Sequence, residues 1–278
     1  MNPSPTESHH AGPAWRPGPF LLLQMLLHCA ALLLMVIWPQ QWPLALATLL
    51  TSHLMLMIVG LWPRSTWMDS NLVRLPSAAV LRNEVAITID DGPDPLVTPQ
   101  VLGILAQHGV VATFFCIGAR AKAHPELCRQ IVAAGHRIEN HGARHPHLVS
   151  LSMPAGWRRE VLDGQTILQD ITGQAPQFYR AVAGLRNVFL APVLHRAGLQ
   201  LATWTRRGFD TRERNPQKVL QRLTRNLKAG DILLLHDGNA ARTTSGSAVI
   251  VAVLPPLLKA LRTRELAPVT LVDACRPQ

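Results

Sequence analysis

The chain begins with two long apolar runs that carry no charge. Residues 20–38 and 42–62 contain no Asp, Glu, Lys or Arg, and each is about as long as the ~20-residue helix that spans a bilayer. Trp38, Trp42 and Trp62 lie at the ends of the runs, where tryptophan is common at the membrane surface. The pattern predicts a transmembrane helical hairpin. A pair of buried helices in a soluble protein is the alternative, and a cleaved signal peptide is disfavoured because a second run follows directly.

Short apolar runs alternate with amphipathic stretches from residue 84 onward. Proline or threonine opens most of the expected helices, which begin at Thr98, Pro125, Pro154, Phe189 and Pro216, with a last helix ending near Arg264. The expected strands are 85–89, 112–116, a short strand ending at 139, 178–180, 199–204, 232–235 and 269–272. This alternation predicts an α/β fold with parallel strands and crossover helices, and it does not distinguish an open sheet from a barrel.

These patterns divide the chain into four parts. Residues 1–19 are rich in Pro, Ser and His and are expected to be disordered. Residues 20–62 form the hairpin, 63–83 a juxtamembrane linker, and 84–278 the α/β domain.

The chain is strongly basic, with a formal net charge of +10. Before Pro63 only Glu7 and Arg16 are charged, and they cancel, so the excess belongs to the rest of the chain. Beside a bilayer, a basic domain is attracted to acidic headgroups or to a phosphate-bearing lipid substrate, although a solvated basic surface is equally open. Nucleic acid is not expected as a partner, because the basic residues are dispersed and no binding motif accompanies them.

The flanking charges predict an orientation. Arg16 precedes the first apolar run, Arg64, Arg74 and Arg82 follow the second, and the connection between the runs has no Lys or Arg. The positive-inside rule then places both termini and the domain 84–278 on the cytoplasmic side of a bacterial inner membrane, with a periplasmic domain as the alternative.

Two adjacent carboxylates, Asp90 and Asp91, end the apolar run 85–89, and His141 and His145 lie further along. A carboxylate and two imidazoles are ligands that zinc-like ions accept, and a second carboxylate beside them can take a proton from water. The expected roles are metal ligand for Asp91 and general base for Asp90. The alternative is an ordinary Asp-Gly-Pro turn and an unrelated pair of histidines.

Five stretches resemble, in order, the polysaccharide deacetylase family (the NodB homology domain, carbohydrate esterase family 4), over about Glu84 to Val272. They are 88–93, similar to T-F-D-D-G-P and followed by a similar second strand at 112–115; 140–145, similar to N-H-[ST]-x-x-H; 180–184, similar to R-x-P-x-G; the strand around Trp204 followed by Asp210; and 234–236, similar to L-x-H. The resemblance implies a distorted, incomplete (β/α) barrel of about seven strands and a metal-dependent hydrolase that removes an N-acyl group, above all N-acetyl, from an amino sugar.

The resemblance also implies roles for particular residues. Asp91, His141 and His145 would hold the divalent ion, with Zn²⁺ the first choice. Asp90 would be the base. His236 would be the general acid that protonates the leaving amine.

Further roles follow from the same resemblance. Asp210 would orient His236, and Arg180 would pair with Asp90. Trp204 and Gly184 would contact the substrate. Independently of the resemblance, Arg206 and Arg207 are expected to be solvated loop charges, with a contact to a substrate phosphate as the alternative.

The sequence departs from the family pattern at two places. Gly142 stands where the family has Ser or Thr, and Val182 stands where it has Pro. Loss of the hydroxyl would weaken metal affinity or pass its hydrogen bond to the backbone. Val182 removes the fixed angle of proline, so the loop after Arg180 is expected to be less preorganised.

Three functions remain open at this stage. A cytoplasmic catalytic domain favours an amino sugar linked to a lipid, such as a polyprenyl phosphate. A periplasmic domain would favour peptidoglycan or an exported polysaccharide. The third possibility is a catalytically silent membrane protein that binds a sugar lipid.

Overall fold

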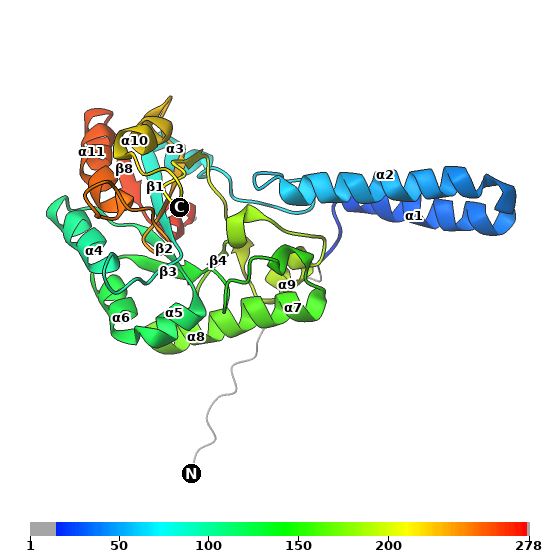
Figure 1. Cartoon of the computed structure of the whole chain (residues 1–278), viewed down its shortest axis with the longest axis horizontal. Coiled ribbons are helices and arrows are strands. Elements are labelled where there is room, and N and C mark those ends of the chain that lie inside the picture. Colours follow the sequence, from blue (N-terminus) through cyan, green and yellow to red (C-terminus); the bar gives the residue numbers. More distant parts are fainter. Residues whose placement is uncertain (1–14, 277–278) are drawn as a thin grey trace, which may run out of the picture.

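A computed structural model describes residues 15–276 of the chain. The disorder expected for residues 1–19 falls mainly on residues outside this range. Two long helices lie side by side and project from an α/β body that contains all the strands (Figure 1).

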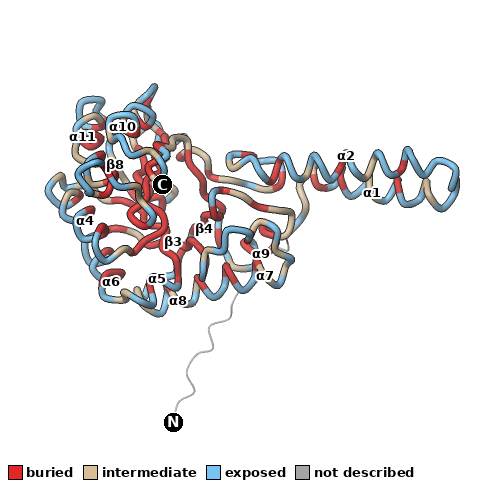
Figure 2. The backbone as a smooth tube through the Cα atoms, viewed as in Figure 1, coloured by how far each residue is buried: buried red, intermediate tan, exposed pale blue. Residues whose placement is uncertain are grey.

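The projecting hairpin consists of α1 (Pro19–Ile37) and α2 (Trp42–Leu61), joined by a 3₁₀ turn at Pro39–Gln41. Most residues of both helices are exposed (Figure 2), and these include most of the large apolar ones, so these helices do not have the burial of core helices in a soluble protein. Both are long and apolar enough to cross a membrane, judged by length and composition. Between them, the buried Ser52 Oγ donates a hydrogen bond of 2.6 Å to Gln24 Oε1.

The body is built on one curled parallel sheet. Its order is β5-β4-β3-β2-β1-β7-β6, and β8 pairs with one end of β1. The strands are β1 Glu84–Asp90, β2 Thr113–Cys116, β3 Arg137–Asn140, β4 Phe178–Tyr179, β5 Gln200–Leu201, β6 Arg206–Arg207, β7 Ile232–His236 and β8 Ala267–Val269. No ladder joins β5 to β6 within residues 15–276, so the barrel is incomplete. The predicted fold class is confirmed.

Helices cover the outer face of this sheet (Figure 1). The helices of the α/β body are α3 Ser77–Leu81, α4 Thr98–Gln107, α5 Gly118–Ala123, α6 Pro125–Ala133, α7 Pro154–Arg158, α8 Gly164–Thr172, α9 Leu190–Arg196, α10 Pro216–Thr224, α11 Val249–Thr263 and α12 Leu271–Cys275. Of these, α3 and α12 pack with Ala86 in a separate cluster on the opposite face of the sheet. A π-helical turn, Arg159–Asp163, joins α7 to α8, so the helix predicted over 154–172 is one continuous rod.

The alternation of side chains along β1 decides which residues can reach the inside of the half-barrel. Val85, Ile87 and Ile89 are fully buried in the cluster shared with the outer helices. Because successive side chains of a strand point to opposite faces, Ala86 and Asp90 share the inner face. The strand therefore delivers Asp90 to the interior at its carboxyl end.

The residues predicted as a linker pack on the sheet. The backbone N–H of Leu72 donates to Leu201 O at 2.9 Å, and the N–H of Thr203 donates to Leu72 O at 3.0 Å. Arg74 forms a 2.8 Å ion pair with the buried Asp231. The hairpin thus joins the body through ordered chain.

The strand predicted at 269–272 is wrong beyond Val269. Strand β8 is Ala267–Val269, and α12 begins at Leu271. The Thr270 side chain accepts a hydrogen bond from the N–H of Asp273, which caps the start of a helix and ends the strand. The short strand β6 was also not predicted.

Candidate active site

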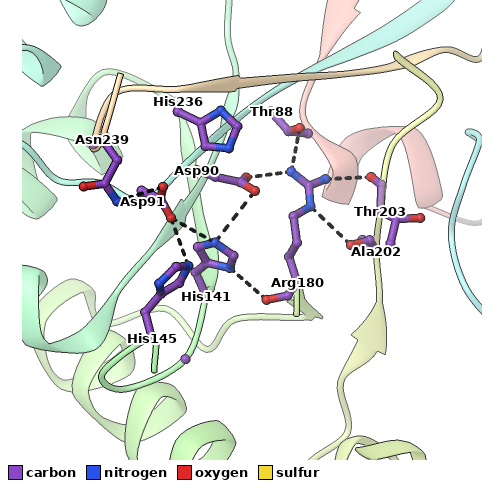
Figure 3. Close-up of polar contacts among 12 residues, drawn as sticks. Thr88, Asp90, Asp91, His141, His145, Arg180, Ala202, Thr203, His236 and Asn239 are labelled. Carbon is purple, nitrogen blue, oxygen red and sulfur yellow. Dashed lines mark hydrogen bonds and ion pairs between the residues drawn. The ribbon is translucent and has the colours of Figure 1, made fainter. Parts of the chain in front are cut away.

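The three predicted metal ligands meet at the carboxyl ends of β1 and β3. Asp91 follows β1 with a left-handed φ of 72°, and His141 follows β3 directly. Asp91 Oδ1 lies 3.2 Å from His141 Nε2 and 3.1 Å from His145 Nε2 (Figure 3). One ligand atom from each residue lies within 4.8 Å of the others, so one ion could contact all three.

Hydrogen bonds fix the orientation of these ligands. His141 Nδ1 donates to the carbonyl oxygen of Arg180 at 2.8 Å. A carbonyl oxygen only accepts, so the proton sits on Nδ1 and leaves Nε2 free for an ion. Asp91 Oδ2 accepts from Asn239 Nδ2 at 3.1 Å, and Arg120 bonds both the carbonyl of Asp91, at 2.7 Å, and Asn239 Oδ1, at 2.9 Å.

The electrostatics of the cluster suit a cation. Burial alone would raise the pKa of Asp91, but hydrogen bonds from His141 and His145 and the charges of His141 and His236 hold this pKa below its usual range. Burial opposes protonation of His141, yet the nearby Asp90 and Asp91 carboxylates raise the pKa of His141 above its usual value. A metal ion held here would therefore compete with a proton for the His141 imidazole, and its binding would release that proton. One carboxylate and two imidazoles fit a divalent ion of the zinc type.

Asp90 lies beside this cluster and is held by a buried guanidinium. Arg180 Nη1 donates to Asp90 Oδ1 at 2.7 Å, while Asp90 Oδ2 lies 3.8 Å from His141 Nε2. Arg180 is completely buried, and its remaining donors bond Thr88 Oγ1 at 2.7 Å and the carbonyls of Ala202 and Thr203 at 3.2 and 2.7 Å. One oxygen of Asp90 is thus fixed and the other faces the ligand cluster.

His236 ends β7, directly opposite Asp90 in the register of β1 and β7. Its Nδ1 contacts Asp210 Oδ1 at 2.9 Å, and its backbone N–H donates to Asp210 Oδ2 at 2.7 Å. Burial alone would lower the pKa of His236, but the charge and hydrogen bond of Asp210 raise it to about 9. The imidazole can hold a proton at neutral pH, with Nε2 as the free end.

A cleft of about 620 Å³ opens over these residues. Trp204 forms part of its wall, as do Val182 and Ala183. Gly184 is not among the lining residues. With φ of 75°, it lets Trp204 and Pro63 pack so closely that a Cβ would lie 2.9 and 2.5 Å from them. The structure therefore places Gly184 beneath the cleft wall.

Four arginines line the cleft, and the sequence pattern singled out only one of them. They are Arg120, Arg144, Arg207 and Arg212. The expectation of solvated charges for Arg206 and Arg207 is wrong, because both lie half-buried in β6. Arg206 does not line the cleft, and it forms a 2.6 Å ion pair with Asp231. Asn239 was also missed, since an Asp-Gly-Asn turn after His236 carries no signal that points to Asp91.

Comparisons with known proteins identify this fold and site as those of a carbohydrate N-deacetylase, a hydrolase of carbon–nitrogen bonds in amino sugars. The polysaccharide deacetylase family model matches residues 78–202. A peptidoglycan-N-acetylglucosamine deacetylase of Bacillus cereus is 36% identical over 177 residues, 63% of this chain and 82% of the relative. The chain therefore belongs to the polysaccharide deacetylase family.

Two further comparisons agree with this assignment. A chitooligosaccharide deacetylase of Bradyrhizobium is 36% identical over 173 residues, 59% of this chain and 78% of the relative. A crystal structure of a peptidoglycan N-acetylglucosamine deacetylase superposes with a TM-score of 0.64 at 28% identity, covering 73% of this chain and 92% of that one. The resemblance seen in the motifs thus extends over most of the α/β body.

Metal binding by the cluster can be tested without a substrate. We expect the full-length protein, loaded with Zn²⁺ and desalted, to retain about one ion per chain. Asp91→Ala and His145→Ala should each lose most of it, because an ion with fewer protein ligands dissociates faster. His147→Ala is the matched control, since its ring centroid lies 6.3 Å from that of His145 and outside the cluster. Elemental analysis gives the ratio, and full retention in both ligand variants would contradict the assignment.

Proposed function

We propose that this protein is a membrane-anchored, metal-dependent deacetylase that removes the N-acetyl group of an amino sugar carrying a phosphate-linked lipid. The observation that carries the hydrolytic part is the meeting of Asp91, His141 and His145 beside two proton-transfer groups, Asp90 and His236. The ligand set favours Zn²⁺ among the divalent ions.

The reaction needs one group that takes a proton and one that gives a proton. A divalent ion held by the cluster would lower the pKa of water and polarise the acyl carbonyl. Asp90 takes a proton from the water molecule while the oxygen of that water bonds the acyl carbon. His236 then donates a proton to the sugar nitrogen as the carbon–nitrogen bond breaks, which gives the carboxylic acid and the free amine. Arg180 holds the base in place, and Asp210 holds the acid.

The hairpin supports membrane anchoring. Its two helices have the length and composition of membrane spans, and their apolar side chains face outward over most of their length. Arg16 and Arg64 flank the ends that meet the body, which supports a cytoplasmic catalytic domain. We propose a multi-pass anchor in a bacterial inner membrane, with residues 84–278 as the catalytic domain and 63–83 as its packed connection.

The arginines of the cleft support an anionic substrate. Arg207 is the strongest of them: its guanidinium carbon lies 5.3 Å from the Trp204 ring and 5.0 Å from the Phe209 ring. Its buried Nε has no hydrogen-bond partner among residues 15–276. A sugar stacked on Trp204 would bring a phosphate on its ring within reach of this cation. A polyprenyl phosphate is the lipid carrier that this arrangement and the membrane anchor favour together.

The proposed activity predicts release of acetate from an N-acetylglucosamine prenyl phosphate by the Zn²⁺-loaded full-length protein. Asp90→Asn keeps the shape but cannot accept the proton, so kcat should fall by about 10²-fold or more. Asp170→Asn, on the exposed face of α8, should leave the rate unchanged. Enzymatic measurement of acetate decides it, and metal-loaded protein that turns over no acylated sugar would favour the silent sugar-lipid-binding alternative.

The role of His236 predicts a pH effect. With Asp210 present, the raised pKa of His236, about 9, keeps the acid protonated through neutral pH. Asp210→Asn removes the charge that raises it, so the protonated form is lost earlier as pH rises. The alkaline limb of the kcat profile should move to lower pH by about 1–2 units. Rates measured from pH 6 to 10 test this, and coincident alkaline limbs in the two proteins would refute the acid role.

A substrate phosphate predicts a selective effect at Arg207. Arg207→Gln should raise KM for the prenyl phosphate substrate by about tenfold, the size expected for one charged hydrogen bond. KM for an uncharged alkyl glycoside of the same sugar should stay within about twofold. Arg196→Gln, on the exposed face of α9, is the control. An equal rise for both substrates would mean that Arg207 shapes the cleft without contacting an anion.

The side of the membrane separates this substrate from an extracytoplasmic glycan. A fluorescent or alkaline phosphatase reporter fused after Gln278 should show the cytoplasmic pattern, with fluorescence and no phosphatase activity. Phosphatase activity would place the domain in the periplasm. It would favour peptidoglycan or an exported polysaccharide, the class that the name of the Bacillus cereus relative indicates.

A further inference from the structure

We infer that Glu160 is a positioning residue for the metal ligand His145, and that it occupies the place left by the missing side chain at Gly142. Glu160 is buried, although carboxylates are seldom found in protein interiors without a partner. Its Oε1 accepts the backbone N–H of Arg144 at 2.8 Å and that of His145 at 2.6 Å. This inference rests on the proposed metal site, and it adds a residue that none of the matching motifs contains.

The position of Glu160 in the fold explains how it reaches the ligand loop, residues 140–145. Glu160 lies in the π-helical turn Arg159–Asp163, and such turns are frequent at functional sites. The carbonyl oxygen of Glu160 accepts the N–H of Ala143 at 2.9 Å, and the carbonyl oxygen of Val161 accepts Asn140 Nδ2 at 2.9 Å. Glu160 and Val161 in this turn thus present two carbonyls and one carboxylate to a single loop.

The ligand loop needs such support because its backbone is unfavourable. His145 has φ of 59° and Gly142 has φ of 88°. The left-handed region is costly for a residue with a side chain, so His145 keeps this conformation only if other interactions stabilise it. The carboxylate of Glu160 bonds the N–H groups on both sides of the Arg144 α-carbon, and hydrogen bonds to an ionised carboxylate are strong.

Gly142 and Glu160 depend on each other sterically. A Cβ at position 142 would lie 2.5 Å from Glu160 Oε1 and 3.2 Å from its Cδ and Cγ. A Ser or Thr at this position, as the family motif has, could not coexist with Glu160 in its present place. The departure at Gly142 is therefore an exchange: a carboxylate from the π-turn stands where the motif's own side chain would be.

The experiment measures Zn²⁺ affinity of the full-length protein by competition with a chromophoric chelator. Glu160→Ala should raise the Kd about 10- to 100-fold, the usual effect of losing a group that orients a ligand. KM for the deacetylation substrate should remain near the wild-type value while kcat at limiting Zn²⁺ falls. Glu160→Gln keeps an acceptor at the same place without the charge, and its Kd should lie between the two.

A matched control separates positioning from general stability. Glu139, in β3 directly before the ligand loop, is a second buried glutamate, and its carboxylate accepts the N–H groups of Gln177 and Phe178 and none of the loop's own. Glu139→Ala should lower the melting temperature but leave the Kd for Zn²⁺ unchanged. If Glu160→Ala behaves in the same way, with lower melting temperature and unchanged Kd, the inference is wrong.

Double variants test the exchange itself. Gly142→Ser should weaken Zn²⁺ binding in the presence of Glu160, and the Gly142→Ser/Glu160→Ala double variant should bind more tightly than the product of the two single effects predicts. Gly142→Ala/Glu160→Ala carries the same Cβ and backbone strain but no hydroxyl, so it should recover less. If the effects of Gly142→Ser and Glu160→Ala on the Kd for Zn²⁺ simply multiply in the double variant, the proposed exchange is wrong. Because Zn²⁺ binding needs no substrate, failure to find a deacetylation substrate would leave this test intact.

Discussion

The buried residue Arg180 connects the two halves of the site through both its guanidinium and its backbone carbonyl. The side chain bonds Asp90 and Thr88 on β1 and two carbonyls after β5, so it spans the interior of the half-barrel. The carbonyl of the same residue orients His141. Leaving a buried charge without its partner costs about 3–5 kcal/mol, so the positions of Asp90 and His141 and the curvature of the sheet are energetically linked.

The parallel sheet explains why residues so distant in sequence meet. Every strand that contributes to the site ends at the same rim, and the register of β1 with β7 sets Asp90 beside His236. The inner face of β1 carries the polar residues because the alternate positions are buried under the outer helices. The incomplete closure leaves the rim open as a cleft, and the cleft combines a cation site with a wall of arginines. This combination is suited to a substrate that is both acylated and anionic.

Much of the fold and part of the site could be predicted from the sequence. Local signals are strong where a strand is apolar throughout, as in β1, and where two charge-free runs of helical length follow each other. They fail where a capping bond decides the structure, as at Thr270, and where a strand is two residues long, as in β6. Asp90, Asp91, His141, His145, Arg180, Asp210 and His236 could be named because the motifs keep their spacing. Arg120, Asn239 and Glu160 could not, because they act through contacts with residues far away in the chain.

The sequence by itself determined the residue types of the site, the order of strands and helices, and the apolar hairpin, since these depend on composition and periodicity along the chain. Only the tertiary structure decided which polar groups are partners. It showed that Arg206 binds Asp231 while its neighbour Arg207 faces the cleft, that Gly184 lies beneath Trp204, and that Glu160 stands against Gly142. The physical reason is that hydrogen bonds and close packing depend on distances of a few ångströms between segments, and those distances are set by how the whole sheet curls.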